Sequence, residues 1–187
     1  MNELLINNIP EELNESNLPE DLEILVISSN NFDQKLDKLP KSLKVLIINS
    51  VYFNQELNNL PKGLKVLKID CWIFNKELNN LPVGLEKLEI SSSEFNQKLD
   101  NLPEGLKELK IYYCNNFNQE LNNLPEGLRE LKMIYCNNFN KKLENLPLSL
   151  KRLYIGIDYL KYFSLEEVKG MIPLGCELDV VEEKIDL

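Results

Sequence analysis

Four cysteines and the complete absence of histidine decide which side-chain chemistry this sequence can support. Without histidine the chain lacks the commonest general base and the commonest transition-metal ligand. The cysteines Cys71, Cys114, Cys136 and Cys176 do not form the closely spaced pairs of a zinc site. We therefore expect no metal, no cofactor and no enzymatic activity.

A disulfide between Cys114 and Cys136 is the other chemistry to consider, because the two hold equivalent places in neighbouring copies of a repeated motif. Neighbouring strands would place their Cα atoms about 5 Å apart, a separation that a disulfide permits. The N-terminus, however, has neither the basic region nor the long apolar core of a secretory signal. We interpret the cysteines as reduced thiols of a cytoplasmic protein, and Cys114 and Cys136 as buried structural groups.

Asparagines recur in two columns, one after each repeated phenylalanine and one before each repeated Leu-Pro pair. The first column reads Asp33, Asn54, Asn75, Asn96, Asn118 and Asn140, and the second contains Asn59, Asn80, Asn101, Asn123 and Asn145. A calcium ladder would need carboxylates, which the second column lacks. We expect the first column to form a hydrogen-bonded ladder that satisfies loop backbone.

All these residues are placed by a repeat that fills most of the chain. The frame Phe-Asn-x-x-Leu-x-x-Leu-Pro-x-Gly/Ser-Leu-x-x-Leu-x-Ile recurs from Phe32, Phe53, Phe74, Phe95, Phe117 and Phe139. Its second half first occurs at Leu18, and its prolines lie at 19, 40, 61, 82, 103, 125 and 147. This period of 21, lengthening to 22, predicts a solenoid.

The segment Leu-x-x-Leu-x-Ile predicts a short strand with one buried face, and strands one repeat apart must be parallel. The Leu-Pro-x-Gly segment predicts a type I turn, and serine or aspartate at some glycine positions indicates that a positive φ is not required there. The phenylalanines should stack as a spine. The sequence thus predicts an α/β leucine-rich-repeat-like, right-handed solenoid with a strand-lined concave face and a 3₁₀ or irregular convex side.

We expect a single repeat domain over residues 1–187, divided into an N-terminal cap (1–17), seven units (18–155) and a C-terminal helix–strand cap (156–187). In the first cap, Leu4-Leu5-Ile6 suits a strand and Pro10 suits a first helical turn. In the last, Ser164-Leu165-Glu166-Glu167 resembles a capping box, and residues 176–181 alternate like a final strand.

The copies resemble the FNIP repeat, also called IP22, most clearly in Phe53-Asn54-Gln55-Glu56-Leu57-Asn58-Asn59-Leu60-Pro61-Lys62-Gly63-Leu64. That family of leucine-rich-repeat relatives occurs in social amoebae and in giant viruses that infect amoebae. Members often join the repeats to an F-box and are similar to substrate receptors of ubiquitin ligases. Residues 1–18 do not fit an F-box, so the resemblance implies target binding by the repeats.

The strand positions that face solvent offer the first candidate binding surface. They read Ile24, Val45 and Val66 before the second leucine and Val26 and Ile47 after it, where later repeats carry charges. Exposed apolar patches mark interaction sites. Either this patch binds a partner or the N-terminal cap folds over it.

A second candidate surface is formed by tyrosines near the ends of later strands. We predict that Tyr112, Tyr135 and Tyr154 bind a partner, since tyrosine is enriched at interface hot spots. The alternative is that these aromatics, with Tyr113, Trp72 and Tyr52, roof the rim of the solenoid.

Together the composition and the repeats predict a non-enzymatic protein–protein interaction scaffold. A net charge of −9 disfavours nucleic acid and anionic membranes as partners. The protein would act as a monomer or homodimer in the cytoplasm, which for a viral member is the host's. Two alternatives remain: a structural homodimer, or a substrate-recognition subunit of a ubiquitin ligase whose F-box is supplied in trans.

Overall fold

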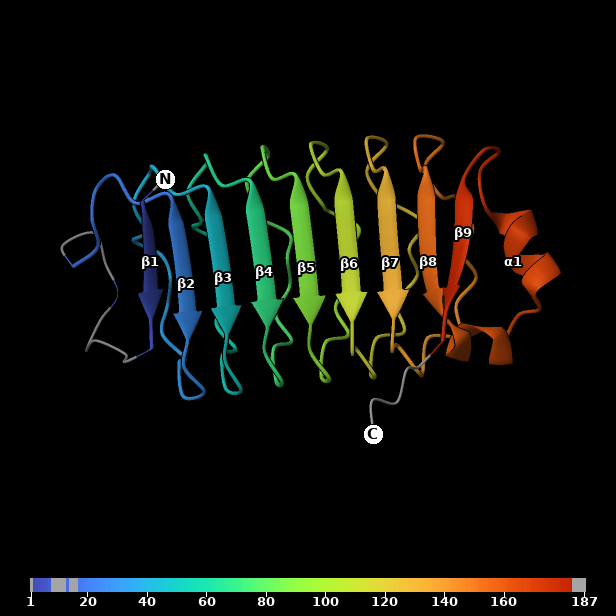
Figure 1. The fold of residues 1–187 in the computed structure, drawn as a ribbon, viewed down its shortest axis with the longest axis horizontal. Coiled ribbons are helices and arrows are strands. Elements are labelled where there is room, and N and C mark those ends of the chain that lie inside the picture. Colours follow the sequence, from blue (N-terminus) through green and yellow to red (C-terminus); the bar gives the residue numbers. More distant parts are fainter. Residues whose placement is uncertain (1, 8–12, 14–16, 183–187) are drawn as a thin grey trace.

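The computed structural model describes residues 2–7, 13 and 17–182, and Figure 1 shows them as one long sheet backed by return segments. Within these described residues nine strands lie in chain order and every neighbouring pair is parallel, which confirms the predicted ladder. The elements are β1 (Glu3–Ile6), β2 (Ile24–Ser28), β3 (Val45–Asn49), β4 (Val66–Asp70), β5 (Lys87–Ser91), β6 (Glu108–Tyr112), β7 (Glu130–Ile134), β8 (Arg152–Gly156), η1 (Ile157–Lys161), α1 (Leu165–Met171) and β9 (Glu177–Val181).

The core follows from the leucine frame. In each repeat strand the second leucine and the isoleucine or methionine two places later point inward, as Leu67 and Ile69 do in β4 with no exposed surface. Behind the strands the six phenylalanines stack as predicted, with successive ring centroids 5.6, 5.9, 6.1, 5.9 and 5.8 Å apart. Tyr159 of η1 continues the stack from Phe139 at 5.6 Å. One hydrophobic core therefore runs the length of the sheet.

The turn before each strand is closed by a backbone bond from the first leucine to the proline carbonyl, as from Leu64 N–H to Pro61 O at 3.0 Å. Among the described glycines only Gly175 has a positive φ, which confirms that the turn glycines do not need one. At Gly105 the requirement is space instead: a Cβ there would lie 2.8 Å from the carbonyl oxygen of Val83. Ser42 fits at its own turn because its hydroxyl donates to Leu22 O at 2.7 Å.

Gly105→Ala should therefore lower the free energy of unfolding by about 1–2 kcal/mol, because the new methyl group overlaps a backbone oxygen. Gly84→Ala is the matched control, since its Cβ would meet nothing closer than 3.6 Å. It should be neutral, or stabilise by up to about 1 kcal/mol through the unfolded chain. Urea unfolding of both variants checks this, and equal losses would contradict the steric explanation.

The return segments are turns and irregular backbone, and within described residues 29–150 they contain no 3₁₀ helix. Of the two predicted conformations for this side, the irregular one is therefore correct. The reason lies in the first asparagine column: Asn96 N–H donates to Asn75 Oδ1 at 3.0 Å, one repeat back, instead of to a local carbonyl. The same bond joins Asn54 to Asp33 (2.9 Å) and Asn118 to Asn96 (2.9 Å), which confirms the predicted ladder. Right-handed winding and a concave sheet face remain predictions.

The two chain ends outside the repeats contain the strands β1 and β9 and the helix α1. Ser164 caps α1 in a reciprocal capping box with Glu167, as its sequence predicts. The turn bond from Cys176 N–H to Pro173 O (3.0 Å) copies the repeat turn and leads into β9. At the other end β1 adds an edge strand beside β2. The helical turn predicted at Pro10 lies outside the described residues.

Candidate binding face

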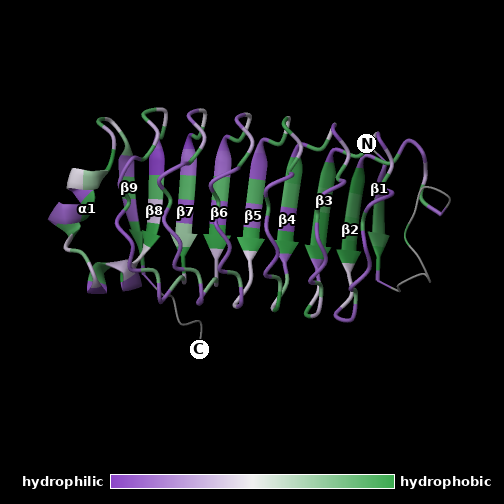
Figure 2. Ribbon diagram, turned by 180° about the vertical axis from the view of Figure 1, so that it is seen from behind, coloured by the Kyte–Doolittle hydropathy of each residue, from purple (hydrophilic) through white to green (hydrophobic). Residues whose placement is uncertain are grey.

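The exposed face of the sheet carries three rows of side chains, because alternate residues of every strand point away from the core. Figure 2 shows the division along it: β1–β3 are almost wholly hydrophobic, whereas hydrophilic bands cross β4–β8. The first row, at the turn side, runs through Ile24, Val45, Val66, Lys87 and Glu108, and the second through Leu5, Val26, Ile47, Lys68 and Glu89.

We call the apolar part of these two rows the apolar strip; it consists of Leu5, Ile24, Val26, Val45, Ile47 and Val66. The register joins the five predicted residues directly, with Ile24 beside Val45 and Val26 beside Ile47. They are half-buried by one another, while Leu5 is 55% exposed. The sequence prediction missed Leu5, whose place beside Val26 required the pairing of β1 with β2. The described part of the N-terminal segment extends the strip instead of covering it.

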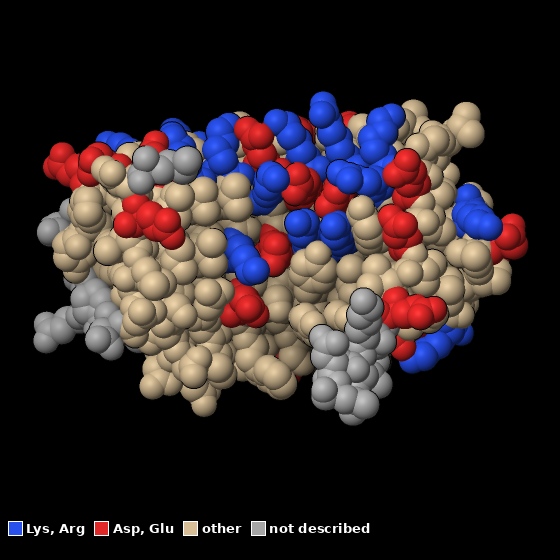
Figure 3. All heavy atoms as spheres, in the orientation of Figure 1, with Lys and Arg blue, Asp and Glu red and all other residues tan. Residues whose placement is uncertain are grey.

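Lysines border the strip at the turn side. We call Lys41, Lys44, Lys62 and Lys65, in the turns before β3 and β4, the lysine edge; all four are exposed. Lys65 pairs with Glu86 at 3.0 Å, whereas Lys41, Lys44 and Lys62 form no ion pair with any described residue. Figure 3 shows basic groups gathered along the upper edge of this face, with acidic groups among and below them.

Most charges on the face of β4–β8 are paired with one another. Lys68 pairs with Glu89 at 2.8 Å and Lys87 with Glu108 at 2.8 Å. Glu130 is only 7% exposed and is held by Arg152 at 3.0 Å and Lys132 at 3.3 Å. These strands form an ionic lattice whose members already have partners, so the apolar strip is distinct from its surroundings.

The predicted tyrosines are split between two places. Tyr112 and Tyr154 lie on the face, where Lys132 sits 4.1 Å from the Tyr154 ring centre. Burial, with Glu89 and Glu130 nearby, raises the pKa of Tyr112 to about 12. Tyr135 instead follows the end of β7 and stacks on Tyr113 at 4.6 Å. The structure therefore does not join these tyrosines to the apolar strip, since the ionic strand β5 lies between.

Tyr113 and Tyr135 explain the change of period. Their φ angles are 50° and 59°, a region that residues with side chains adopt rarely. Each is the extra residue of its repeat, placed between the strand and the inward cysteine. The lengthening from 21 to 22 was the sequence signal for this insertion, but it does not tell which residue is inserted.

The cysteines are unpaired, and Cys71, Cys114 and Cys136 are buried at the bend after a strand. Their thiols donate to backbone carbonyls, as Cys71 does to Ile48 O at 3.5 Å and Cys114 to Tyr112 O at 3.1 Å. Ser50 and Ser92 occupy the same column and bond backbone similarly. The predicted structural role of Cys114 and Cys136 fits these contacts.

Burial raises the pKa of Cys71 and of Cys114 to about 12 and also raises that of Cys136. Since the thiolate is the reactive form, a disulfide reagent at about pH 8 should modify half-exposed Cys176 first and the other three only on unfolding. Rapid modification of all three buried thiols in the native protein would contradict this expectation.

The same raised pKa values predict how stability depends on pH. Unfolded thiols ionise near pH 8.5, so the stability from these buried thiols should be lost as pH rises from there toward 12.

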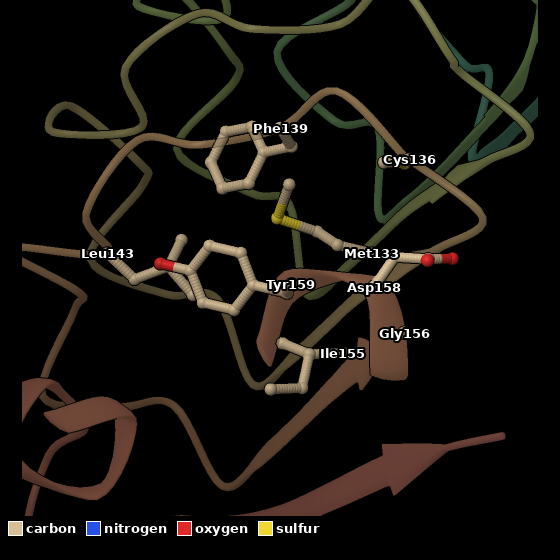
Figure 4. Close-up of a pocket in the computed structure, with 8 residues that line it drawn as sticks. All are labelled: Met133, Cys136, Phe139, Leu143, Ile155, Gly156, Asp158 and Tyr159. Carbon is tan, nitrogen blue, oxygen red and sulfur yellow. The ribbon is translucent and has the colours of Figure 1, made fainter. Parts of the chain in front are cut away.

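The cavities found among the described residues are either very small or lined by polar groups. A small cavity of about 10 Å³ beside Phe139 and Tyr159 is lined mostly by apolar groups (Figure 4), and it has room for about one water. Open grooves on the return side, one of about 490 Å³, are lined by asparagines, lysines and carboxylates such as Asn122 and Lys141. The described residues contain no cluster of metal-ligating side chains.

Comparison with known proteins agrees with this geometry. The FNIP Repeat family matches residues 32–72, 74–114 and 95–136. A crystal structure described as CroV588, a novel circular LRR protein, is similar with a TM-score of 0.70 and 35% identity over 87% of this chain. The chain spans 24% of the length of that protein. No curated protein matches, and no helix among the described residues is long and apolar enough to cross a membrane. Because the repeat matches cover more than half of it, this chain belongs to the FNIP repeat family.

Proposed function

We propose that this protein is a non-enzymatic scaffold that binds a partner protein on the exposed face of its sheet. The fold is typical of interaction scaffolds, since a stack of parallel strands offers a broad surface whose positions vary independently of the core. The observation that carries the proposal is the apolar strip, which lies beside strands whose charges are mostly paired.

The solenoid fold does not require apolar side chains at the positions of the apolar strip. Equivalent positions in β5–β7 carry Lys87, Glu108 and Glu130 in the first row, so charged groups are compatible with the same backbone. Apolar side chains at Ile24 and Val45 therefore serve something other than the solenoid itself. Tyr112 and Tyr154, with Tyr135 beyond the strand end, are a second contact region for a large partner.

Four unpaired cysteines suit a reducing compartment, so we place the protein in the cytoplasm, which for a viral family member is that of the host. A ubiquitin-ligase link with an F-box in trans rests on family resemblance alone.

Affinity capture from amoebal lysate tests the proposal, comparing the native protein with an Ile24→Glu/Ile47→Glu variant. Both substitutions copy residues that later repeats carry at equivalent positions, so the fold should tolerate them. A partner held by the face should be lost from the variant and retained by the matched control Lys76→Glu/Lys98→Glu, on the return side. Identical recovery by all three proteins would remove the strip from the proposal.

Sedimentation at several concentrations separates the structural homodimer from a scaffold for another protein. A dimer built on the strip should dissociate in the Ile24→Glu/Ile47→Glu variant. A native chain that remains monomeric at every concentration would exclude the homodimer and leave the scaffold.

A further inference from the structure

The outline of the apolar strip limits what can occupy it. Its first row spans β2–β4 and its second β1–β3, so its long axis runs obliquely from Leu5 to Val66. Three strand spacings of about 4.8 Å and one two-residue step of about 6.6 Å give a length of about 16 Å. Six side chains, five of them half-buried, expose far less than the roughly 800 Å² per partner of a stable domain interface.

An α-helix fits this outline better than an extended chain. About three helical turns span 16 Å, and helix residues three or four apart lie about 5–6 Å from each other, close to the spacing of the strands. Side chains on one side of an extended peptide lie about 6.6 Å apart and would fall out of step with strands spaced about 4.8 Å apart.

The charges beside the strip differ between its two sides and between its two ends. The lysine edge borders it at β3 and β4, while the opposite side carries uncharged Ser28 and Asn49 on β2 and β3 and one exposed carboxylate, Asp70, on β4. At the β1–β2 end the exposed carboxylates are Glu3, Glu20 and Asp21. A helix macrodipole favours its N-terminus near carboxylates and its C-terminus near lysines.

We propose that the apolar strip receives one amphipathic α-helix of a partner protein, running from Leu5 to Val66 with carboxylates on its C-terminal half facing the lysine edge. The apolar stripe of this helix covers Val26, Val45 and Ile47. Lys41, Lys44 and Lys62, which have no ion-pair partner among the described residues, become paired on binding. This inference rests on the proposed function and names the partner's binding element.

The test is a selection of random peptides of about 16 residues, roughly four helical turns, displayed against the whole protein. Enriched peptides should have apolar residues at three- and four-residue spacing and acidic residues in the C-terminal half, and they should become helical on binding. Their affinity should fall at least about tenfold for Ile47→Glu and about tenfold at low salt for Lys41→Glu/Lys44→Glu/Lys62→Glu.

Lys76→Glu/Lys98→Glu/Lys141→Glu, with the same charge change on the return side, should bind these peptides as the native protein does. If Ile47→Glu melts early, Ile47→Ser replaces it. Peptides with alternating apolar residues, basic peptides, peptides insensitive to Ile47→Glu, or no enrichment would each overturn the helix. If non-helical peptides are selected and need Ile47, the scaffold function survives without the helix.

Discussion

Phe95→Ala is expected to lower the free energy of unfolding by about 3–5 kcal/mol. The ring has no exposed surface and stacks between Phe74 at 6.1 Å and Phe117 at 5.9 Å. Truncation leaves a cavity in the middle of the solenoid and weakens the interface with both neighbouring repeats, on which a repeat protein depends. Urea unfolding followed by circular dichroism measures the loss.

Trp72→Ala is the control for removal of an aromatic side chain. Trp72 is 64% exposed, so its loss should change stability by no more than about 1 kcal/mol. The alternative that Trp72 covers the rim of the solenoid stays a prediction. Similar costs for the two variants would mean that the phenylalanine stack is not the main support of the return segments.

Asn75→Ala is expected to cost about 1–3 kcal/mol, because it leaves a backbone donor without an acceptor. Asn75 Oδ1 accepts from Asn96 N–H at 3.0 Å and from Gln97 Nε2 at 2.9 Å. These bonds join one repeat to the next, so their loss separates two return segments that have no regular secondary structure. Thermal and urea unfolding both report the effect.

Asn75→Asp separates loss of the acceptor from other effects of the substitution. The first repeat has aspartate here, and Asp33 Oδ1 accepts from Asn54 N–H at 2.9 Å. The variant keeps an acceptor oxygen and should cost less than about 1 kcal/mol. If aspartate and alanine are equally destabilising, the ladder oxygen is not the source of the stability.

The repeat made much of this structure predictable. Side chains that recur every 21 residues must fall into columns, so the phenylalanine stack, the asparagine ladder and the neighbouring places of Ile24 and Val45 could be inferred without coordinates. The observed strand register places Ile24 beside Val45, as predicted. This register is fixed because a one-residue slip would turn every core leucine toward solvent. The binding role of these residues stays a prediction.

The sequence predicted the positions of side chains less well where the chain departs from the 21-residue repeat. Leu5 belongs to the apolar strip only because β1 pairs with β2 through contacts that no repeat motif announces. The position of Tyr135 near a strand end predicts the same surroundings as for Tyr112. Tyr135 instead adopts a left-handed backbone and stacks on Tyr113 just beyond the end of β7.

The sequence by itself determined the parallel solenoid, its core and its resemblance to the FNIP repeat, because these depend only on which residue types recur and at what spacing along the chain. Only the tertiary structure decided which charges already have partners: Glu130 and Lys87 are paired, whereas Lys44 and Lys62 form no ion pair with a described residue. Ion pairing depends on side-chain separations of a few ångströms across strands, which side-chain conformation fixes and residue order does not.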